Sequence, residues 1–167
     1  DRSVSRGLRD VYKRQELAEL LMDNKEELSD LLTTEHGKPL HEAIGEVEGA
    51  AGFLRYAAES ARRIEGEIVT SEMENEQAWI QRVPFGVTVG IVAWNFPLAL
   101  AARKIGNALV CGNTMIVKPP SETPLTVMRF GELIAGKSSL PAGVLNFITG
   151  SGRVVGDALV RNQIVKL

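Results

Sequence analysis

The sequence predicts an α/β protein, in which N-terminal helices are followed by a truncated, doubly wound parallel sheet. Apolar residues recur at helical spacing through residues 16–63, which indicates a helical N-terminal part. After Gly86, short continuous apolar runs alternate with helical segments. Strand, helix and strand at this spacing favour right-handed crossovers and a parallel sheet. Because the apolar runs are continuous rather than alternating, we expect this sheet to be covered on both faces.

The composition excludes several classes of protein. The chain has 167 residues, of which 44% are hydrophobic and 24% are charged, and its formal net charge is −2. This profile is typical of a soluble globular protein and predicts no binding to nucleic acid or to an anionic membrane. The single cysteine excludes an internal disulfide framework and fits a reducing compartment. With no run of 18 apolar residues and no visible signal peptide, we expect a cytoplasmic protein without a membrane span.

Both ends of the chain look unusual. Asp10–Gln15, which reads DVYKRQ, resembles the in-frame translation of a transposase adapter used in sequencing libraries, and the preceding residues extend this likeness. A genuine basic leader is the alternative. At the other end, QIVKL breaks off within an apparent strand, so we expect a piece of a larger protein. The expected organisation is a non-native leader over 1–15, a helical and edge-strand part over 16–83, and an incomplete doubly wound domain over 84–167.

The N-terminal part is expected to contain two helices and an edge strand. Leucines at helical spacing predict a helix over 16–34, which Gly37 and Pro39 end. A second helical pattern covers 40–63. The helical period is then lost, and an alternating pattern near the end of 67–83 predicts the edge strand.

The doubly wound part is expected to contain four strands. The apolar runs that predict them are 87–94, 114–118, 144–149 and 164–167. The helical segments between the strands lie near 98–110, 124–135 and 153–161. In open α/β sheets, ligands bind beyond the carboxyl ends of the strands. The stretches that follow these ends are 94–97, 118–124 and 149–156, and we expect them to converge on one edge of the sheet.

Side chains at this edge have both structural and functional interpretations. In the structural interpretation, Asn95 caps the helix that starts near Pro97. In the functional interpretation, its amide lies beside a reacting carbonyl group and donates to the developing oxyanion. Trp94 offers an apolar wall for a ring. Lys118 is either a solvated residue at the end of a strand or a residue that binds a ribose hydroxyl or a phosphate. Glu122 fits a cap or a favourable charge at the start of the next helix.

Three glycines precede the last predicted helix. Gly150, Gly152 and Gly156 follow the pattern G-x-G-x-x-x-G. They fit a tight strand-to-helix turn, and small residues at such a place also let backbone N–H groups approach a pyrophosphate. The spacing departs from the G-x-G-x-x-G dinucleotide fingerprint, so this signal is weak on its own.

Longer stretches of the chain carry a more specific signal. They read EHGKPLHEAIGE, IEGEIV, PFGVTVGIVAWNFP, ALVCGNTMIVKPPSETPLT, LPAGVLNFITGSG and VGDALV. Within them, W-N-F-P, G-N-T-x-x-x-K-P and L-P-x-G-V-x-N occur in this order. From Thr33 to Leu167 the sequence therefore resembles the N-terminal and early cofactor-binding part of an aldehyde dehydrogenase. The likeness points first to the lactaldehyde and glycolaldehyde group and then to the succinate-semialdehyde group.

This resemblance implies a Rossmann-like, dinucleotide-binding domain over 84–167 and NAD(P)-dependent oxidation of a small aldehyde to the carboxylic acid. It implies that Asn95 stabilises the oxyanion and that Lys118 binds the adenosine ribose. Trp94, Val92 and Ala93 would line the nicotinamide-ribose side, although the family usually has proline in place of Ala93. The glycines implied to lie under the pyrophosphate and adenine are Gly152 and Gly156.

The resemblance also bears on cofactor choice. In NAD-preferring relatives the stretch reads K-P-x-E-x-T-P, and its glutamate accepts bonds from the ribose hydroxyls. Here Ser121 takes the place of that glutamate, and Glu122 comes one residue late. Because a carboxylate repels a 2′-phosphate and a serine does not, we expect NAD or NADP with a leaning to NADP. The alternative is that Glu122 swings back and restores the preference for NAD.

Several expectations concern what the chain lacks. By the resemblance, the catalytic cysteine and the general-base glutamate lie beyond Leu167, so the chain alone is expected to oxidise no aldehyde. Cys111 is expected to be a small buried residue rather than the nucleophile. His36 and His41 are expected at the surface, and no metal site is predicted. The larger protein is expected to be a homo-oligomer, because an exposed edge strand favours pairing with another chain. Two alternative functions stay open, namely a nucleotide-binding module without catalysis and a redox-inactive structural subunit.

Overall fold

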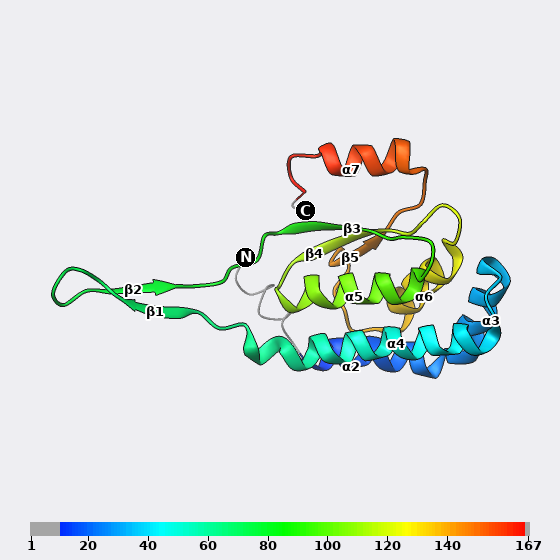
Figure 1. Cartoon of the computed structure of the whole chain (residues 1–167), viewed down its shortest axis with the longest axis horizontal. Coiled ribbons are helices and arrows are strands. Elements are labelled where there is room, and N and C mark those ends of the chain that lie inside the picture. Colours follow the sequence, from blue (N-terminus) through cyan, green and yellow to red (C-terminus); the bar gives the residue numbers. More distant parts are fainter. Residues whose placement is uncertain (1–10, 166–167) are drawn as a thin grey trace.

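The computed structural model describes residues 11–165 and has an α/β fold (Figure 1). Helices α2, α3 and α4 form an outer layer, α5 and α6 lie between that layer and a three-stranded sheet, and α7 lies across the sheet from α5. The predicted class, N-terminal helices followed by a parallel α/β sheet, is confirmed. The elements are α2 (Val11–Asp23), α3 (Lys25–His36), α4 (Leu40–Glu59), a 3₁₀ turn (Ser60–Arg63), β1 (Glu67–Thr70), β2 (Gln77–Ile80), β3 (Val87–Ile91), α5 (Pro97–Val110), β4 (Thr114–Lys118), α6 (Leu125–Lys137), β5 (Leu145–Phe147), a π-helical turn (Gly152–Gly156) and α7 (Asp157–Arg161).

The first predicted helix is in fact two helices. The break falls at Asn24, whose backbone N–H and side-chain amide both donate to the carbonyl oxygen of Leu20, at 3.3 and 2.8 Å. Asparagine competes with the helical ladder in this way, which the leucine spacing over 16–34 did not indicate. Helix α2 begins at Val11 and so runs through the end of the predicted leader. The assignment of 1–15 as non-native stays a prediction, and residues 1–10 lie outside the described residues.

One hydrophobic core joins the helical layers to the sheet. Its fully buried side chains come from the outer helices, from α5 and α6, and from the sheet, and they include Leu17, Leu54, Leu98, Val117 and Phe130. Helices α4 and α5 approach closely at Gly106, where an added Cβ would lie 2.8 Å from the Cβ of Ala57. The outer helices are therefore packed directly against the helices that follow β3 and β4.

The three strands β3, β4 and β5 are parallel, and β4 is central. Ile91 pairs with Lys118 and Val117 pairs with Phe147, so the carboxyl ends of the strands lie side by side. Strands β3 and β5 are shorter than the predicted 87–94 and 144–149 because their last residues bend into loops. The last predicted helix, 153–161, begins as the π-helical turn and becomes α-helical only in α7.

The prediction of a fourth strand over 164–167 is wrong for residues 164 and 165, which are the two that the structure describes. Residues 164 and 165 lie in and after a turn, in which the backbone N–H of Ile164 donates to Oδ1 of Asn162 at 2.9 Å. An asparagine side chain that bonds two residues ahead forms such a turn and interrupts a strand. Residues 166–167 lie outside the described residues. The sheet face towards α7 is only partly covered, because Ile91 keeps 40% of its surface exposed.

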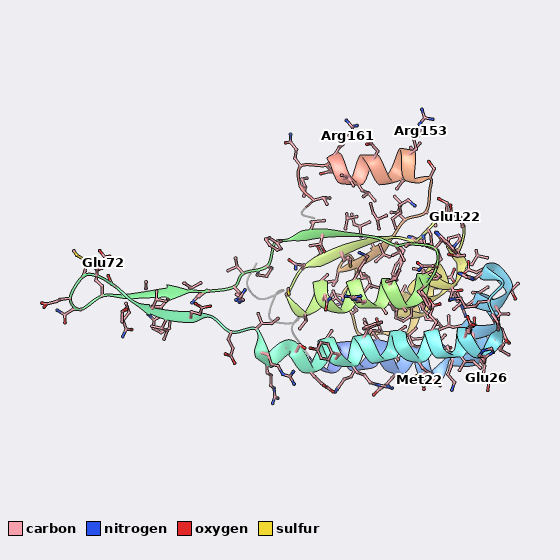
Figure 2. The ribbon with its side chains drawn as sticks, viewed as in Figure 1. Met22, Glu26, Glu72, Glu122, Arg153 and Arg161 are labelled. Atoms are coloured by element: carbon pink, nitrogen blue, oxygen red, sulfur yellow. The ribbon has the colours of Figure 1, made fainter. Side chains whose placement is uncertain are left out.

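Strands β1 and β2 form an antiparallel hairpin that projects from the body of the molecule (Figure 1). All residues of both strands are exposed, and Glu72 lies at the tip (Figure 2). Ile68 and Trp79, which are paired across the hairpin, are 62% and 64% exposed. The predicted edge strand therefore exists and has one partner, with no core behind it. No helix within residues 11–165 is long and apolar enough to cross a membrane.

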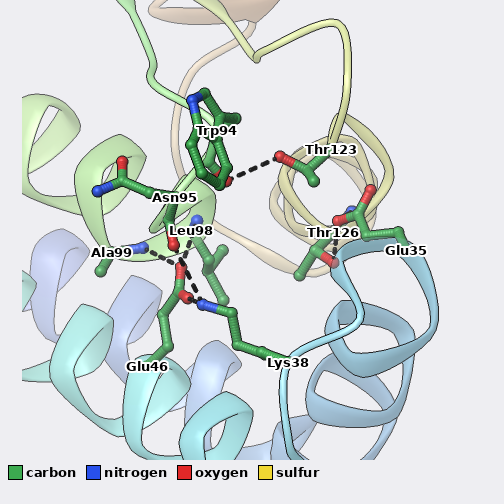
Figure 3. A network of polar contacts seen from close by, with 9 residues as sticks. All are labelled: Glu35, Lys38, Glu46, Trp94, Asn95, Leu98, Ala99, Thr123 and Thr126. Carbon is green, nitrogen blue, oxygen red and sulfur yellow. Dashed lines mark hydrogen bonds and ion pairs between the residues drawn. The ribbon is translucent and has the colours of Figure 1, made fainter.

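Helix α3 is joined to α6 by a carboxylate at its end. Oε2 of Glu35 accepts the backbone N–H of Leu125 at 2.7 Å. Its Oε1 accepts the N–H of Thr126 at 2.9 Å, and Figure 3 shows Glu35 beside Thr126. Glu35 thereby caps a helix 90 residues further along the chain. Nearby, Arg129 donates to Glu27 at 2.6 Å and lowers the pKa of that carboxyl group, but both side chains are exposed and this ion pair adds little stability.

We expect Glu35→Ala to lower the free energy of unfolding of the chain by about 1–2 kcal/mol, because it leaves two N–H groups of α6 without their acceptor. Urea unfolding followed by circular dichroism measures this difference. Asp30→Ala is the matched control, since its exposed side chain on the same helix has no bonding partner among residues 11–165. An equal effect of both substitutions would contradict the capping role.

Candidate functional site

The three predicted stretches meet at the carboxyl edge of the sheet. The hydroxyl of Thr123, in the loop after β4, donates to the carbonyl oxygen of Trp94, after β3, at 3.2 Å (Figure 3). The hydroxyl of Ser121 lies 3.4 Å from the carbonyl oxygen of Gly150, after β5, and donates to it. The predicted convergence is confirmed, and side-chain bonds between the loops hold it.

Trp94 forms an exposed wall at this edge. Its side chain is 60% exposed, and its ring stacks on the ring of His36 with centroids 6.0 Å apart and planes 24° from parallel. The prediction that His36 lies at the surface is only partly correct, because the residue is half-buried and both of its ring nitrogens are buried. The end of α3 packs under the β3–α5 turn, which a single sequence does not reveal. His41 is exposed, as predicted.

Asn95 presents an uncommitted amide to solvent. The residue is exposed, and its side chain makes no hydrogen bond to any residue of the described range 11–165 (Figure 3). Its interpretation as a helix cap is wrong, because the N-cap position of α5 is Phe96 and Glu46 accepts the first helical N–H groups. The Asn95 amide is therefore free to donate to a ligand.

Glu46 caps α5 from within helix α4. Its Oε1 accepts the backbone N–H groups of Leu98 and Ala99 at 2.9 and 3.2 Å, and its side chain is fully buried (Figure 3). Its Oε2 is ion-paired with Lys38, whose side chain is only 5% exposed.

Lys38 reaches the turn itself. Its ammonium donates to the carbonyl oxygen of Asn95 at 3.2 Å and lies 4.5 Å from the centroid of the Phe96 ring. Sequence reasoning missed both Lys38 and Glu46 as residues of the site. The available signal was Glu46 itself, an acidic residue on the otherwise apolar stripe of α4 that also carries Ala43, Val47 and Ala50.

Lys118 and Val92 are less accessible than their predicted roles suggest. Lys118 is 3% exposed, so its interpretation as a solvated strand end is wrong, and its ammonium donates to the carbonyl oxygen of Pro119 at 3.0 Å. An ammonium has three donors, so further bonds to a ligand are open to it. The side chain of Val92 is buried in the core, which leaves its backbone for any ligand contact. Ala93 is exposed.

Glu122 and Ser121 lie exposed in the loop after β4. Figure 2 labels Glu122 in this loop. Glu122 does not cap α6, because Glu35 occupies that position. The carboxylate of Glu122 has no hydrogen-bonding partner in the described part of the chain. The Glu122 carboxylate is therefore free to turn towards a ligand at this edge, whereas the Ser121 hydroxyl would first exchange its bond to the carbonyl oxygen of Gly150.

The glycines after β5 differ in whether the backbone and its neighbours would accept a larger residue. Gly150 has φ of 145°, and a Cβ there would lie 2.4 Å from a methyl group of Val155, so the fold itself requires glycine. At Gly152 and Gly156 an added Cβ meets nothing within 4 Å. Both line an open hollow of about 590 Å³ that Ile91 and Val160 also border. The open space beside these two glycines would allow a ligand to approach the backbone closely.

Cys111 lies away from this edge. It caps the C-terminus of α5 and precedes β4, so it sits at the opposite end of the sheet from Asn95. The prediction that Cys111 is buried is wrong, because it follows the last helical residue and is exposed. Within residues 11–165, no group of three or more His, Cys, Asp or Glu side chains is placed to hold a metal ion.

Comparison with known proteins connects this geometry to a family. The family model described as the aldehyde dehydrogenase family matches residues 12–167. The chain belongs to the aldehyde dehydrogenase family. Among curated members, it is 51% identical over 150 residues to 3,6-anhydro-alpha-L-galactose dehydrogenase of Vibrio sp. (strain EJY3), a match that covers 90% of this chain and 31% of that protein.

Other members of the aldehyde dehydrogenase family are similar as well. Succinate-semialdehyde dehydrogenase [NADP(+)] of Escherichia coli (strain K12) is 42% identical, over 88% of this chain and 30% of its own length. The structure of 3,6-anhydro-L-galactose dehydrogenase in complex with NAP matches with a TM-score of 0.90 and 49% identity, over 96% of this chain and 33% of that one. Lactaldehyde dehydrogenase from Escherichia coli matches with a TM-score of 0.91 and 36% identity, over 95% and 33%. The chain thus spans about a third of the length of these relatives.

We expect Asn95→Ala to change the free energy of unfolding of the chain by less than about 0.5 kcal/mol, because the exposed amide has no partner to lose. Urea unfolding of the chain and its variant measures this. Thr123→Val is the comparison, since it removes the bond to the carbonyl oxygen of Trp94 and is expected to destabilise. Marked destabilisation by Asn95→Ala would show that the side chain has a structural role.

Proposed function

We propose that the protein to which this chain belongs is an NAD(P)-dependent aldehyde dehydrogenase that oxidises a small aldehyde to the carboxylic acid. The observation that carries the proposal is the free Asn95 amide, presented at the carboxyl edge of the sheet on a turn whose backbone is held from several sides. Membership of the family supports the reaction type. When bound, the nicotinamide of the cofactor supplies a hydride acceptor.

Asn95 is proposed to act as an oxyanion donor. Oxidation of an aldehyde by covalent catalysis converts the carbonyl oxygen into an oxyanion as a nucleophile adds to the carbon. A fixed amide N–H stabilises that charge more than it stabilises the neutral carbonyl oxygen. The family's catalytic cysteine and general-base glutamate are expected to lie outside these 167 residues, and the chain alone is therefore predicted to oxidise no aldehyde.

The cofactor is proposed to lie along this edge of the sheet. Trp94 and the backbone at Val92 and Ala93 would face the nicotinamide-ribose side, and Lys118 would bind the adenosine ribose. The open space beside Gly152 and Gly156 supports their place under the pyrophosphate and adenine.

The proposal includes acceptance of NADP. Ser121 carries no charge that would repel a 2′-phosphate, and relatives named for NADP(+) act on succinate semialdehyde and D-glyceraldehyde. Glu122 is the group that opposes it, because its unpaired carboxylate lies in the same loop.

A cytoplasmic location and assembly into a homo-oligomer belong to the same proposal. The hairpin supports assembly, because Ile68, Trp79 and Ile80 expose apolar surface on strands that no other part of the described chain covers.

In the full protein, we expect Asn95→Ala to lower kcat by roughly 100- to 1,000-fold while KM changes much less, because an oxyanion donor acts in the transition state. Steady-state kinetics with a small aldehyde measures both constants. Asn107→Ala is the matched control, since Asn107 is exposed on α5 and its side chain has no partner within residues 11–165. A near-normal kcat for Asn95→Ala would refute the assignment.

We also expect Ser121→Glu to shift the ratio of kcat/KM for NADP over NAD towards NAD by about tenfold or more, because the new carboxylate repels the 2′-phosphate. The ratio is measured in the full protein before and after the substitution. Glu122→Gln is expected to move the ratio the other way or leave it unchanged. A wild-type protein that strongly prefers NAD, with no change in Ser121→Glu, would remove Ser121 from cofactor choice.

A further inference from the structure

We propose that Lys38 and Glu46 are positioning residues that set the direction of the Asn95 amide. Neither residue reaches the reacting atoms, and both act through the backbone of the β3–α5 turn. The inference rests on the proposed role of Asn95 as an oxyanion donor. It assigns a catalytic consequence to an ion pair that lies outside the sheet and its loops.

The pair holds the turn at two neighbouring points. Glu46 accepts the N–H groups of Leu98 and Ala99 through one carboxylate oxygen and binds Lys38 through the other. Lys38 then donates to the carbonyl oxygen of Asn95. The start of α5 and the peptide after Asn95 are thus tied to one carboxylate (Figure 3).

This tie determines where the amide can lie. Within residues 11–165, the only hydrogen bond that Asn95 makes outside the regular backbone pattern is the one its carbonyl oxygen accepts from Lys38. The side chain has no partner of its own, so its direction follows from the backbone and from rotamer preference. A catalytic group displaced by about 1 Å loses roughly 100-fold in rate, which makes the position of this backbone relevant to turnover.

Stability alone does not account for the pair. Both side chains are almost fully buried, at 5% and 0% exposed. Burying two charges carries a large desolvation cost, and an apolar pair of similar volume is often neutral or stabilising instead. What an apolar pair cannot do is accept two helical N–H groups and donate to the carbonyl oxygen of Asn95. The directional bonds are therefore the property that this pair supplies.

A second lysine–glutamate pair provides an internal comparison. Lys25 of α3 and Glu48 of α4 are 3.1 Å apart, with side chains 34% and 50% exposed. This pair joins the same helical layer, but within residues 11–165 neither side chain forms a hydrogen bond or ion pair with the β3–α5 turn. It contains the same charges without the proposed effect.

The test is a double-mutant cycle in the full protein, in which Lys38→Met is introduced into the wild type and into Asn95→Ala. In the wild type we expect kcat to fall roughly 10- to 100-fold with little change in KM. In the Asn95→Ala background the same substitution is expected to change kcat less than about threefold, because the group that it positions is gone. Lys38→Arg is expected to restore part of kcat, and Lys25→Met to leave it unchanged.

A readout independent of activity comes from amide hydrogen exchange of the full protein. Glu46→Gln is expected to lower the melting temperature, because it leaves the Lys38 charge buried without its partner, and to speed exchange at Leu98 and Ala99 more than at the other amides of α5. Glu48→Gln is expected to do neither. If Lys38→Met unfolds the protein, Lys38→Arg takes its place in the cycle, with a smaller loss of kcat expected in the wild type only.

The outcomes separate the two proposals. Equal losses of kcat from Lys38→Met in both backgrounds, or unchanged exchange at Leu98 and Ala99 in Glu46→Gln, would overturn the positioning role. A normal kcat in Asn95→Ala alone would instead overturn the proposed function, whatever Lys38 does.

Discussion

The start of a helix leaves backbone N–H groups without partners, and satisfying those of α5 and α6 is the constraint on which the carboxyl edge depends. Both helices begin directly after the loops that carry the candidate site. Their acceptors are Glu46 and Glu35, which belong to α4 and α3 and not to the loops. The helix starts are thereby bonded to the outer helical layer.

Capping from outside leaves the loop residues uncommitted. Asparagine is a good N-cap residue and glutamate is a favourable charge near a helix start, and Asn95 and Glu122 each lie within three residues of such a start. Because glutamates from elsewhere take that role, the Asn95 amide and the Glu122 carboxylate stay exposed without partners in the described chain. The N-terminal helices thus contribute to the site although none of the predicted site residues lies on them.

The sequence was sufficient for the sheet and insufficient for its contacts with the helical layer. Apolar runs placed β3, β4 and β5 and the order of the loops at the carboxyl edge, because buried parallel strands have a local signature. The bonds from Glu46 and Glu35 to α5 and α6 join residues 52 and 90 positions apart, and no local pattern encodes such a distance. The same applies to His36, whose stacking on Trp94 depends on how α3 meets the turn. Asn24 and Asn162 were overlooked for a different reason, since single asparagines redirected the backbone within patterns that otherwise favoured a helix and a strand.

The capping glutamates also have a consequence for the order in which the chain acquires structure. Synthesis proceeds from the N-terminus, so α3 and α4 leave the ribosome before the helices that they cap. Glu46 and Glu35 are therefore already available when α5 and α6 emerge, and each new helix can satisfy its first turn as it forms. If the order along the chain were reversed, the first N–H groups of α5 and α6 would be synthesised before the glutamates that accept them. In this arrangement α3 and α4 supply hydrogen-bond acceptors for the later helices, next to which the candidate site lies.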